Sequence, residues 1–242
     1  NSKKEINTEE IIFSPIGYVN CKQKDRYEAP RQATHAKNSK GFIQLKKYHN
    51  FEQAVRDLEG FERIWLIYYF HINDGWKPLI SPPRFHEKKV GVFSSRSPFR
   101  PNPIGLSCVK LDRVDNLKIY ISELDLLDGT PIIDIKPYIP YADAFPESKT
   151  GWLIPKDIEY EIVFSKEAKL QADILNKEDN VSIQNYTKVQ LQFEPDNDTR
   201  KRIIKTKELF DNNDVFILKF RQLEISYTID KETKIVFVIE VK

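Results

Sequence analysis

A proline-rich segment carries the side chains with the clearest chemical potential in this sequence. Residues 95–107 read SRSPFRPNPIGLS. Proline fixes φ, lacks a backbone donor and pushes the preceding residue toward an extended conformation, so this segment is predicted to be a stiff irregular loop. Arg96, Arg100 and Asn102 on such a loop suit recognition of a carboxylate, a phosphate or a ribose. A loop clamped internally by its own arginines is the alternative that the spacing leaves open.

A second group of reactive side chains lies in the segment DIKPYIPYAD, residues 134–143. Asp134, Lys136, Tyr138 and Asp143 place carboxylates, an amine and a phenol beside prolines. Such a set can orient an amino nitrogen and receive its proton. Because Asp134 and Lys136 alternate with isoleucines, an exposed strand face with a surface ion pair is the alternative.

The composition is that of a globular protein. Of the 242 residues, 40% are hydrophobic and 31% are charged, which is enough apolar surface for a core. No stretch approaches the roughly 18 apolar residues of a membrane helix, and residues 1–10 have no signal-peptide core, so we expect a cytoplasmic protein. Cys21 and Cys108 lie outside any metal-ligand or CxxC spacing, so we expect neither a disulfide nor a metal site.

The charge is distributed unevenly, although the formal net charge is only +2. Lys22 to Lys47 and Lys77 to Arg113 each hold eight basic residues against two acidic ones. These stretches suit contacts with nucleic-acid phosphates, and solvated surface charge is the alternative.

The chain divides near residues 155–159 into two regions, and the secondary-structure elements of each region are predicted from its sequence pattern. All eight glycines and 13 of the 14 prolines precede Ile158. Residues 1–157 alternate short apolar runs with turns, which predicts a mostly β domain closed into a barrel or sandwich, with one helix at Phe51–Leu58. Residues 158–242 predict a small α+β domain with a helix at Lys166–Leu175 and a hairpin over residues 223–241, whereas Gln184–Phe193 is ambiguous between helix and strand.

Three sequence blocks resemble one known family. They are PRQ at residues 30–32, GVFSSRSPFRPNPIGLS at 91–107 and LDLLDGTPIIDIKPYIP at 124–140, and they occur in the order typical of the YaeB/TsaA family of TrmO-type tRNA methyltransferases. The resemblance implies a β-barrel that binds S-adenosylmethionine and works as a homodimer. The implied reaction is N6-methylation of threonylcarbamoyladenosine at position 37 of tRNA, next to the anticodon.

The resemblance also implies which residues bind the methyl donor. Arg96 would pair with its carboxylate, and Asp125 would accept from one of its hydroxyl or amino groups. Ile72 and Glu123 depart from the family, in which a polar and a small residue, respectively, are common at these places. His71 taken alone, at the end of an apolar run, favours a packing role over a ligand role. The full set implied by the resemblance is Pro30, Arg31, Gln32, His71, Ile72, Arg96, Leu106, Ser122, Glu123, Leu124 and Asp125.

For the acceptor, methyl transfer from a sulfonium requires mainly alignment, which can supply about 7 to 11 kcal/mol. We expect Asp134, Lys136 and Tyr138 to handle the acceptor nitrogen, with Arg100 and Asn102 contributing from the proline-rich loop. The anticodon loop would be held by the basic stretches and by stacking on aromatic residues, with the domain 158–242 binding tRNA or supporting a dimer. A methyltransferase with a different acceptor and a non-catalytic RNA-binding protein remain the alternatives.

Overall fold

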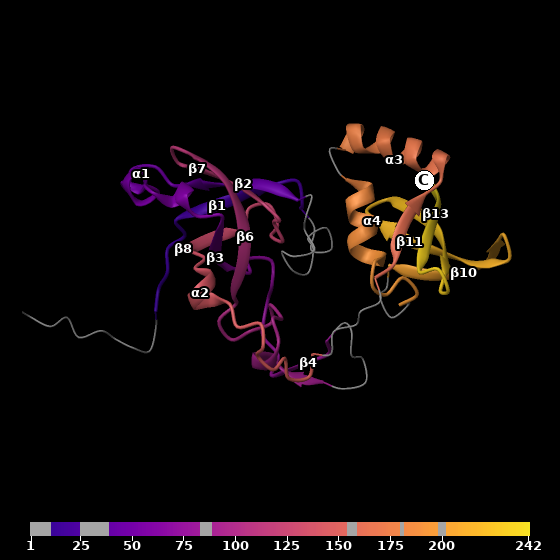
Figure 1. Ribbon diagram of the computed structural model, residues 1–242, viewed down its shortest axis with the longest axis horizontal. Coiled ribbons are helices and arrows are strands. Elements are labelled where there is room, and N and C mark those ends of the chain that lie inside the picture. Colours follow the sequence, from indigo (N-terminus) through magenta and orange to yellow (C-terminus); the bar gives the residue numbers. More distant parts are fainter. Residues whose placement is uncertain (1–10, 25–38, 83–88, 154–158, 180–181, 198–201) are drawn as a thin grey trace, which may run out of the picture. The chain divides into compact units, whose positions relative to one another are not determined.

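The computed structural model describes residues 11–24, 39–82, 89–153, 159–179, 182–197 and 202–242. It separates into two compact units, Asn1–Ala144 and Phe145–Lys242 (Figure 1). Within the described ranges, no helix is long and apolar enough to cross a membrane.

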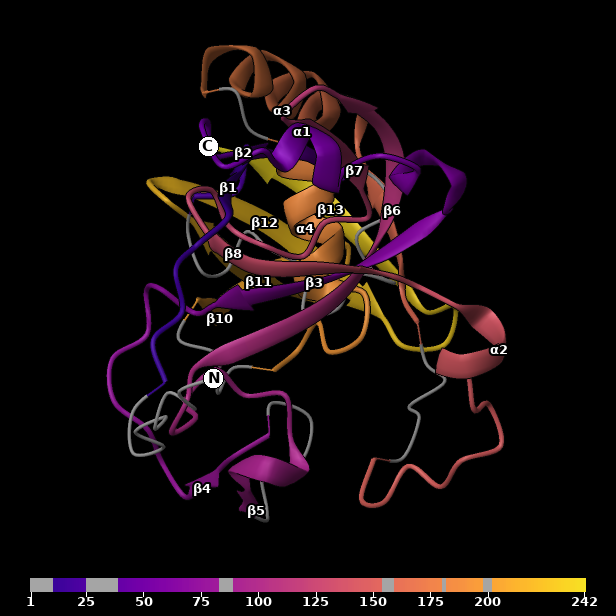
Figure 2. The same ribbon diagram turned by 90° about the vertical axis from the view of Figure 1, so that its left-hand side faces the viewer.

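The first unit is a closed barrel, as expected for a mostly β domain, with strand order β1-β2-β7-β6-β3-β8. Its strands are β1 (Gly17–Cys21), β2 (Lys40–Leu45), β3 (Arg63–Tyr69), β6 (Ile104–Asp115), β7 (Lys118–Ser122) and β8 (Pro131–Pro137). Strand β3 lies between β6 and β8, and pairs antiparallel with both (Figure 2). The barrel closes where Gly17 of β1 pairs with Ile132 of β8.

Side-chain alternation along β3 fills the barrel interior. Ile64, Leu66 and Tyr68 are buried, whereas the residues between them face outward. Gly105 of β6 makes room for the Tyr68 ring, because a Cβ at this position would lie 2.3 Å from two ring atoms. The Tyr68 ring therefore fills the space that a side chain at Gly105 would occupy.

Short elements surround the barrel. The helix was predicted over residues 51–58, and this prediction was too long. In the structure, α1 spans only Phe51–Ala54. Asp57 adopts a left-handed conformation, with φ of 64°, and starts the separate 3-10 turn η2 (Leu58–Gly60). Between β3 and β6 the chain forms β4 (Leu79–Ile80), β5 (Val90–Gly91) and the 3-10 turn η3 (Val92–Ser94), and α2 (Pro140–Asp143) follows β8.

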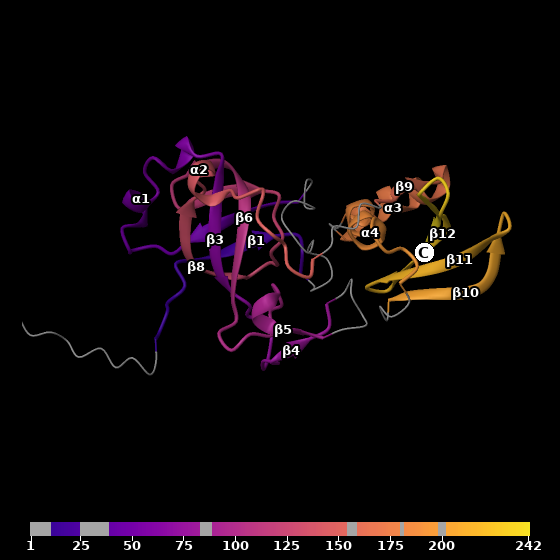
Figure 3. The same cartoon turned by 60° about the horizontal axis from the view of Figure 1, so that its bottom comes forward.

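The second unit is α+β, also as expected. Its sheet has the order β10-β11-β12-β13-β9, and α3 and α4 lie on one face of it (Figure 3). The expected hairpin is present, with Asp230 paired to Ile235, and the ambiguous segment is helical. The elements are β9 (Glu161–Phe164), α3 (Lys166–Asp179), α4 (Ile183–Leu191), β10 (Ile203–Phe210), β11 (Asn213–Phe220), β12 (Leu223–Asp230) and β13 (Ile235–Val241).

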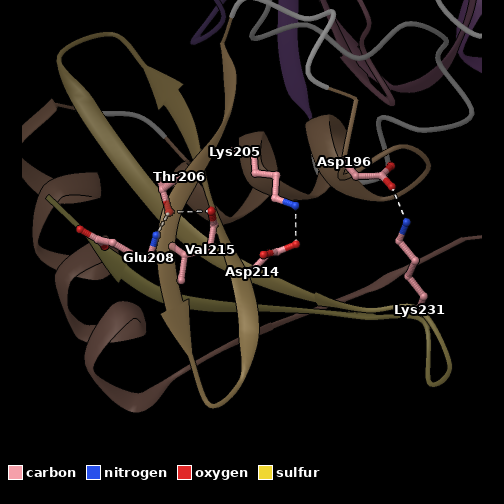
Figure 4. A network of polar contacts seen from close by, with 7 residues as sticks. All are labelled: Asp196, Lys205, Thr206, Glu208, Asp214, Val215 and Lys231. Atoms are coloured by element: carbon pink, nitrogen blue, oxygen red, sulfur yellow. Dashed lines mark hydrogen bonds and ion pairs between the residues drawn. The ribbon is translucent and has the colours of Figure 1, made fainter.

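A polar pocket opens at the end of this sheet that carries the β10–β11 and β12–β13 turns. Figure 4 shows the polar contacts in this region. Two ion pairs line it, Lys205–Asp214 at 2.5 Å and Lys231–Asp196 at 2.8 Å. Nearby, the hydroxyl of Thr206 donates to the Val215 carbonyl at 2.9 Å, where the β10–β11 register shifts. The polar groups of this region are thus partnered within the unit.

Candidate functional site

The proline-rich loop is held together by its own polar groups. The Ser95 hydroxyl donates to the Val92 carbonyl at 2.8 Å and accepts from the Ser97 backbone N–H at 3.2 Å. Nη1 of Arg100 donates to the carbonyls of Val92 and Ser95, at 3.1 and 2.9 Å. Arg100 therefore clamps the loop, whereas Arg96 is exposed. The role of Arg100 toward an acceptor stays a prediction.

The charges of Arg96 and Asp125 both influence the buried phenol of Tyr68. The hydroxyl of Tyr68 accepts a hydrogen bond from Ser107 at 3.3 Å. Burial raises the pKa of Tyr68, and the charge of Asp125 raises it further, whereas the Ser107 hydrogen bond and the charge of Arg96 lower it. One of these charges comes from the proline-rich loop and the other from the segment Ser122–Asp125, and their joint role in binding a ligand stays a prediction.

His71 and Ile72 follow β3 directly and are exposed. Burial lowers the pKa of His71, although a backbone hydrogen bond with Tyr69 opposes this, so the neutral imidazole is favoured near pH 7. A Cβ at Gly129 would lie 4.0 Å from Nε2 of His71. The turn that precedes β8 therefore lies beside His71.

The segment Ser122–Asp125 runs from the end of β7 into the barrel core. The Ser122 hydroxyl donates to Asp112 at 2.8 Å, and the Leu124 side chain is fully buried. Glu123 adopts a left-handed conformation, with φ of 56°. Its carboxylate is 2.6 Å from Nη2 of Arg63. The carboxylate of Glu123 is therefore held by β3.

Two buried polar atoms beside these segments have no hydrogen-bond partner among the described residues. They are Oε1 of Gln23 and Nδ2 of Asn73. Gln23 donates through Nε2 to the Leu124 carbonyl at 3.5 Å, and Asn73 follows Ile72 in the chain. Oε1 of Gln23 can accept a hydrogen bond from a ligand, and Nδ2 of Asn73 can donate one.

The predicted acceptor residues lie on the outer wall of the barrel. Lys136 and Asp134 form an ion pair at 2.9 Å with side chains 62% and 47% exposed, which is the surface pair that the alternation allowed. Tyr138 packs on Trp65, with ring centroids 5.8 Å apart. The Trp65 indole N–H donates to Asp143 at 2.9 Å, and the hydrogen bonds from Ile139 and Trp65 lower the pKa of Asp143.

The strand register shows how far Asp134, on this outer wall, lies from Leu106, a predicted donor-binding residue. Ile67 pairs with Leu106 on β6 and with Asp134 on β8. Neighbouring strands are about 4.8 Å apart, so the backbones of Leu106 and Asp134 are separated by roughly 10 Å. Leu106 is 53% exposed on the outside of β6. Asn102 is exposed as well, and its carbonyl accepts from Ile104 at 2.7 Å.

Pro30, Arg31 and Gln32 lie outside the described residues. Within the described ranges, no three His, Cys, Asp or Glu side chains gather as metal ligands. Sequence reasoning missed Tyr68, Gln23 and Asn73. Tyr68 stands in an apolar run that resembles ordinary core, and nothing in the sequence distinguishes its hydroxyl from other buried tyrosines.

The geometry defines a class: a closed antiparallel barrel with a rigid arginine-bearing loop. The family model of the tRNA-methyltransferase O N-terminal domain matches residues 18–144, more than half of the chain. The chain belongs to the tRNA-methyltransferase O family, which confirms the resemblance inferred from the sequence blocks.

Individual relatives agree with this assignment. The chain is 40% identical over 147 residues to the tRNA (adenine(37)-N6)-methyltransferase of Escherichia coli, a match that covers 58% of this chain and 63% of that enzyme. It is 42% identical over 144 residues to a probable S-adenosyl-L-methionine-binding protein of Pyrococcus abyssi, covering 59% of this chain and 76% of that protein. The crystal structure of TrmO from Pseudomonas aeruginosa is similar with a TM-score of 0.68 and 26% identity, over 96% of this chain and 99% of that one.

Proposed function

We propose that this protein transfers a methyl group from S-adenosylmethionine to N6 of threonylcarbamoyladenosine at position 37 of tRNA. The observation that carries the proposal is the stiff loop that presents the exposed Arg96 and is held by hydrogen bonds from Arg100 to the Val92 and Ser95 carbonyls. An exposed cation on a rigid loop matches the carboxylate of such a donor, and the carboxylate of Asp125, whose charge acts on Tyr68 together with that of Arg96, matches its amino group. The similarity to the Escherichia coli enzyme supports the choice of acceptor.

The chain's own residues would bind and orient the donor. S-adenosylmethionine supplies an activated methyl on a sulfonium. Arg96, exposed on the stiff loop, would pair with its carboxylate, and Asp125 would accept from its hydroxyl or amino groups. Gln23 Oε1 and Asn73 Nδ2 would gain the partners that they lack among the described residues. His71, with its lowered pKa, is neutral near pH 7 and would not repel the sulfonium.

Asp134 is the proposed group that receives the proton of the acceptor nitrogen. Methylation places a positive charge on the acceptor nitrogen. That charge is lost when the nitrogen releases its proton, which a nearby carboxylate can accept. Lys136, 2.9 Å away, would orient the Asp134 carboxylate. Tyr138 and Asn102 would help to place the base, and Arg100 would act mainly by keeping the loop rigid.

The proposed partners are tRNA and a second copy of this chain. Exposed apolar side chains on neighbouring barrel strands, Tyr69 of β3 with Ile104 and Leu106 of β6, support a homodimer. The basic stretches Lys22–Lys47 and Lys77–Arg113 suit phosphate contacts. The tRNA substrate implies a cytoplasmic location, and residues 158–242 would bind tRNA or support the dimer.

The test is incubation with labelled S-adenosylmethionine and two tRNA pools, one with and one without threonylcarbamoyladenosine, followed by nucleoside analysis. Label confined to the modified nucleoside of the first pool is the expected result. Label in both pools would point to another acceptor. Label in neither, with no thermal stabilisation by the donor, would contradict the proposal and favour a non-catalytic RNA-binding protein.

A further inference from the structure

Glu123 adopts a backbone conformation that is unfavourable for a glutamate. Its φ of 56° lies in the left-handed region, which glutamate rarely adopts because its Cβ approaches the backbone oxygen. The residues on both sides, Ser122 and Leu124, are buried. The segment cannot shift without disturbing the core, so an interaction must hold this conformation in place.

Arg63 supplies that interaction across an intervening strand. Lys110 of β6 pairs with Arg63 of β3 on one side and with Ser122 of β7 on the other. The Arg63 and Glu123 side chains meet over β6, where Nη2 lies 2.6 Å from Oε2. The two side chains are only 31% and 23% exposed, so water screens this pair less than the Asp134–Lys136 pair.

The surroundings of the pair favour the charged form of the Arg63 guanidinium. The hydrogen bond with Glu123 raises the pKa of Arg63, against the opposing effect of burial. Cys108 of β6 lies beneath the pair: burial raises the pKa of its thiol, and the charge of Arg63 lowers it. The charges of Asp143 and Glu123 also reach this thiol. The Arg63 carbonyl also accepts from the Tyr138 backbone N–H at 3.0 Å, so Arg63 contacts both the donor segment and a proposed acceptor residue.

We propose that Arg63 is a positioning residue for the methyl-donor segment, because its ion pair with Glu123 holds the left-handed turn from which Leu124 enters the core and Asp125 reaches the end of the barrel. Arg63 acts through this turn and does not touch the reacting atoms. The effect on the donor rests on the proposed function, whereas the effect on the turn does not. A glycine at position 123 would adopt the same turn without the ion pair.

The test is a double-mutant cycle in the full-length chain with R63Q, E123G and R63Q/E123G. We expect R63Q to weaken S-adenosylmethionine binding by about five- to tenfold, measured by titration calorimetry, because the turn loses its support. Whatever E123G does by itself, adding R63Q to it should change the dissociation constant by less than about twofold. R113Q, which removes the Arg113–Asp115 pair of the same barrel, is the matched control.

Hydrogen exchange of the Leu124 amide reports on the turn independently of ligand. This amide donates to the Ser39 carbonyl at 3.4 Å. We expect R63Q to speed its exchange about fivefold, with no further effect of R63Q in the E123G background. The proposal would be overturned if R63Q weakened donor binding and sped the Leu124 exchange equally in the wild-type and E123G backgrounds. It would also be overturned if R63Q had no effect in either background. If the wild type binds no donor, the proposed function fails, and exchange at Leu124 still decides the role of Arg63.

Discussion

At the end of the barrel, Arg96 and Asp125 act on one buried phenol, whereas the charged residues of the pocket in the second unit pair off across exposed strands and turns. The barrel groups come from a loop, a strand and a post-strand segment that are far apart in the sequence. The pairs of the second unit, such as Lys205–Asp214, neutralise each other locally. This contrast supports the proposal that the methyl-donor site lies in the barrel rather than at the pocket of the second unit.

The largest effect is expected on turnover. Replacing Asp134 by Ala should reduce the methylation rate by about 100-fold or more, because a proton acceptor contributes roughly 100- to 10,000-fold. The affinity for S-adenosylmethionine should change little. D115A, which removes another exposed carboxylate of the barrel, is the control. Unchanged turnover in D134A would assign Asp134 to a surface ion pair alone.

R96A should weaken binding of S-adenosylmethionine by about 30-fold, which corresponds to about 2 kcal/mol for one charge-assisted contact. Titration calorimetry measures this directly. R56A is the control, because Arg56 is also an exposed arginine of this unit and its side chain donates to Gln53 at 3.4 Å, away from the proline-rich loop. Equal affinities of R96A and the wild type would separate the proline-rich loop from the donor site.

G105A tests whether the Tyr68 ring is held tightly. The added Cβ would lie 2.3 Å from the ring, so the free energy of unfolding should fall by about 1 to 3 kcal/mol in a denaturant titration. G60A is the matched control, because a Cβ there meets nothing within 4 Å. If both variants unfold at the same denaturant concentration, the ring has room to move.

D214N should have the smallest effect. Lys205 and Asp214 are 54% and 49% exposed, so breaking their pair should cost about 1 kcal/mol of stability or less. Methylation of tRNA should be unaffected. A turnover defect in D214N without loss of stability would show that the pocket of the second unit participates in substrate binding. That result would contradict the contrast drawn between the two units.

The strands were largely predictable because alternation is a local property. Ile64, Leu66 and Tyr68 form one buried face that their spacing of two residues already indicates, and the hairpin between β12 and β13 is equally clear. The helix at residue 51 was predicted too long, because apolar spacing continued to Leu58 while the backbone at Asp57 turned left-handed. The segment after Gln184 became helical where Ser182 caps the helix start by accepting from Asn185.

The types of the site residues were predictable, but their neighbours were not. The prolines and arginines of residues 95–107 indicated a rigid binding loop by themselves. The structure made Arg100 a clamp and left Arg96 exposed, a distinction that spacing cannot make. The contact of Arg63 with Glu123 joins residues 60 positions apart and depends on β6 lying between their strands.

The sequence by itself determined the rigid loop, the alternation of the strands and the family to which the chain belongs, because each follows from residues close together in the chain. Only the tertiary structure decided which charges meet. Barrel closure through Gly17 and Ile132 brings distant strands together, and a charge acts over a few ångströms of space whatever its separation along the chain.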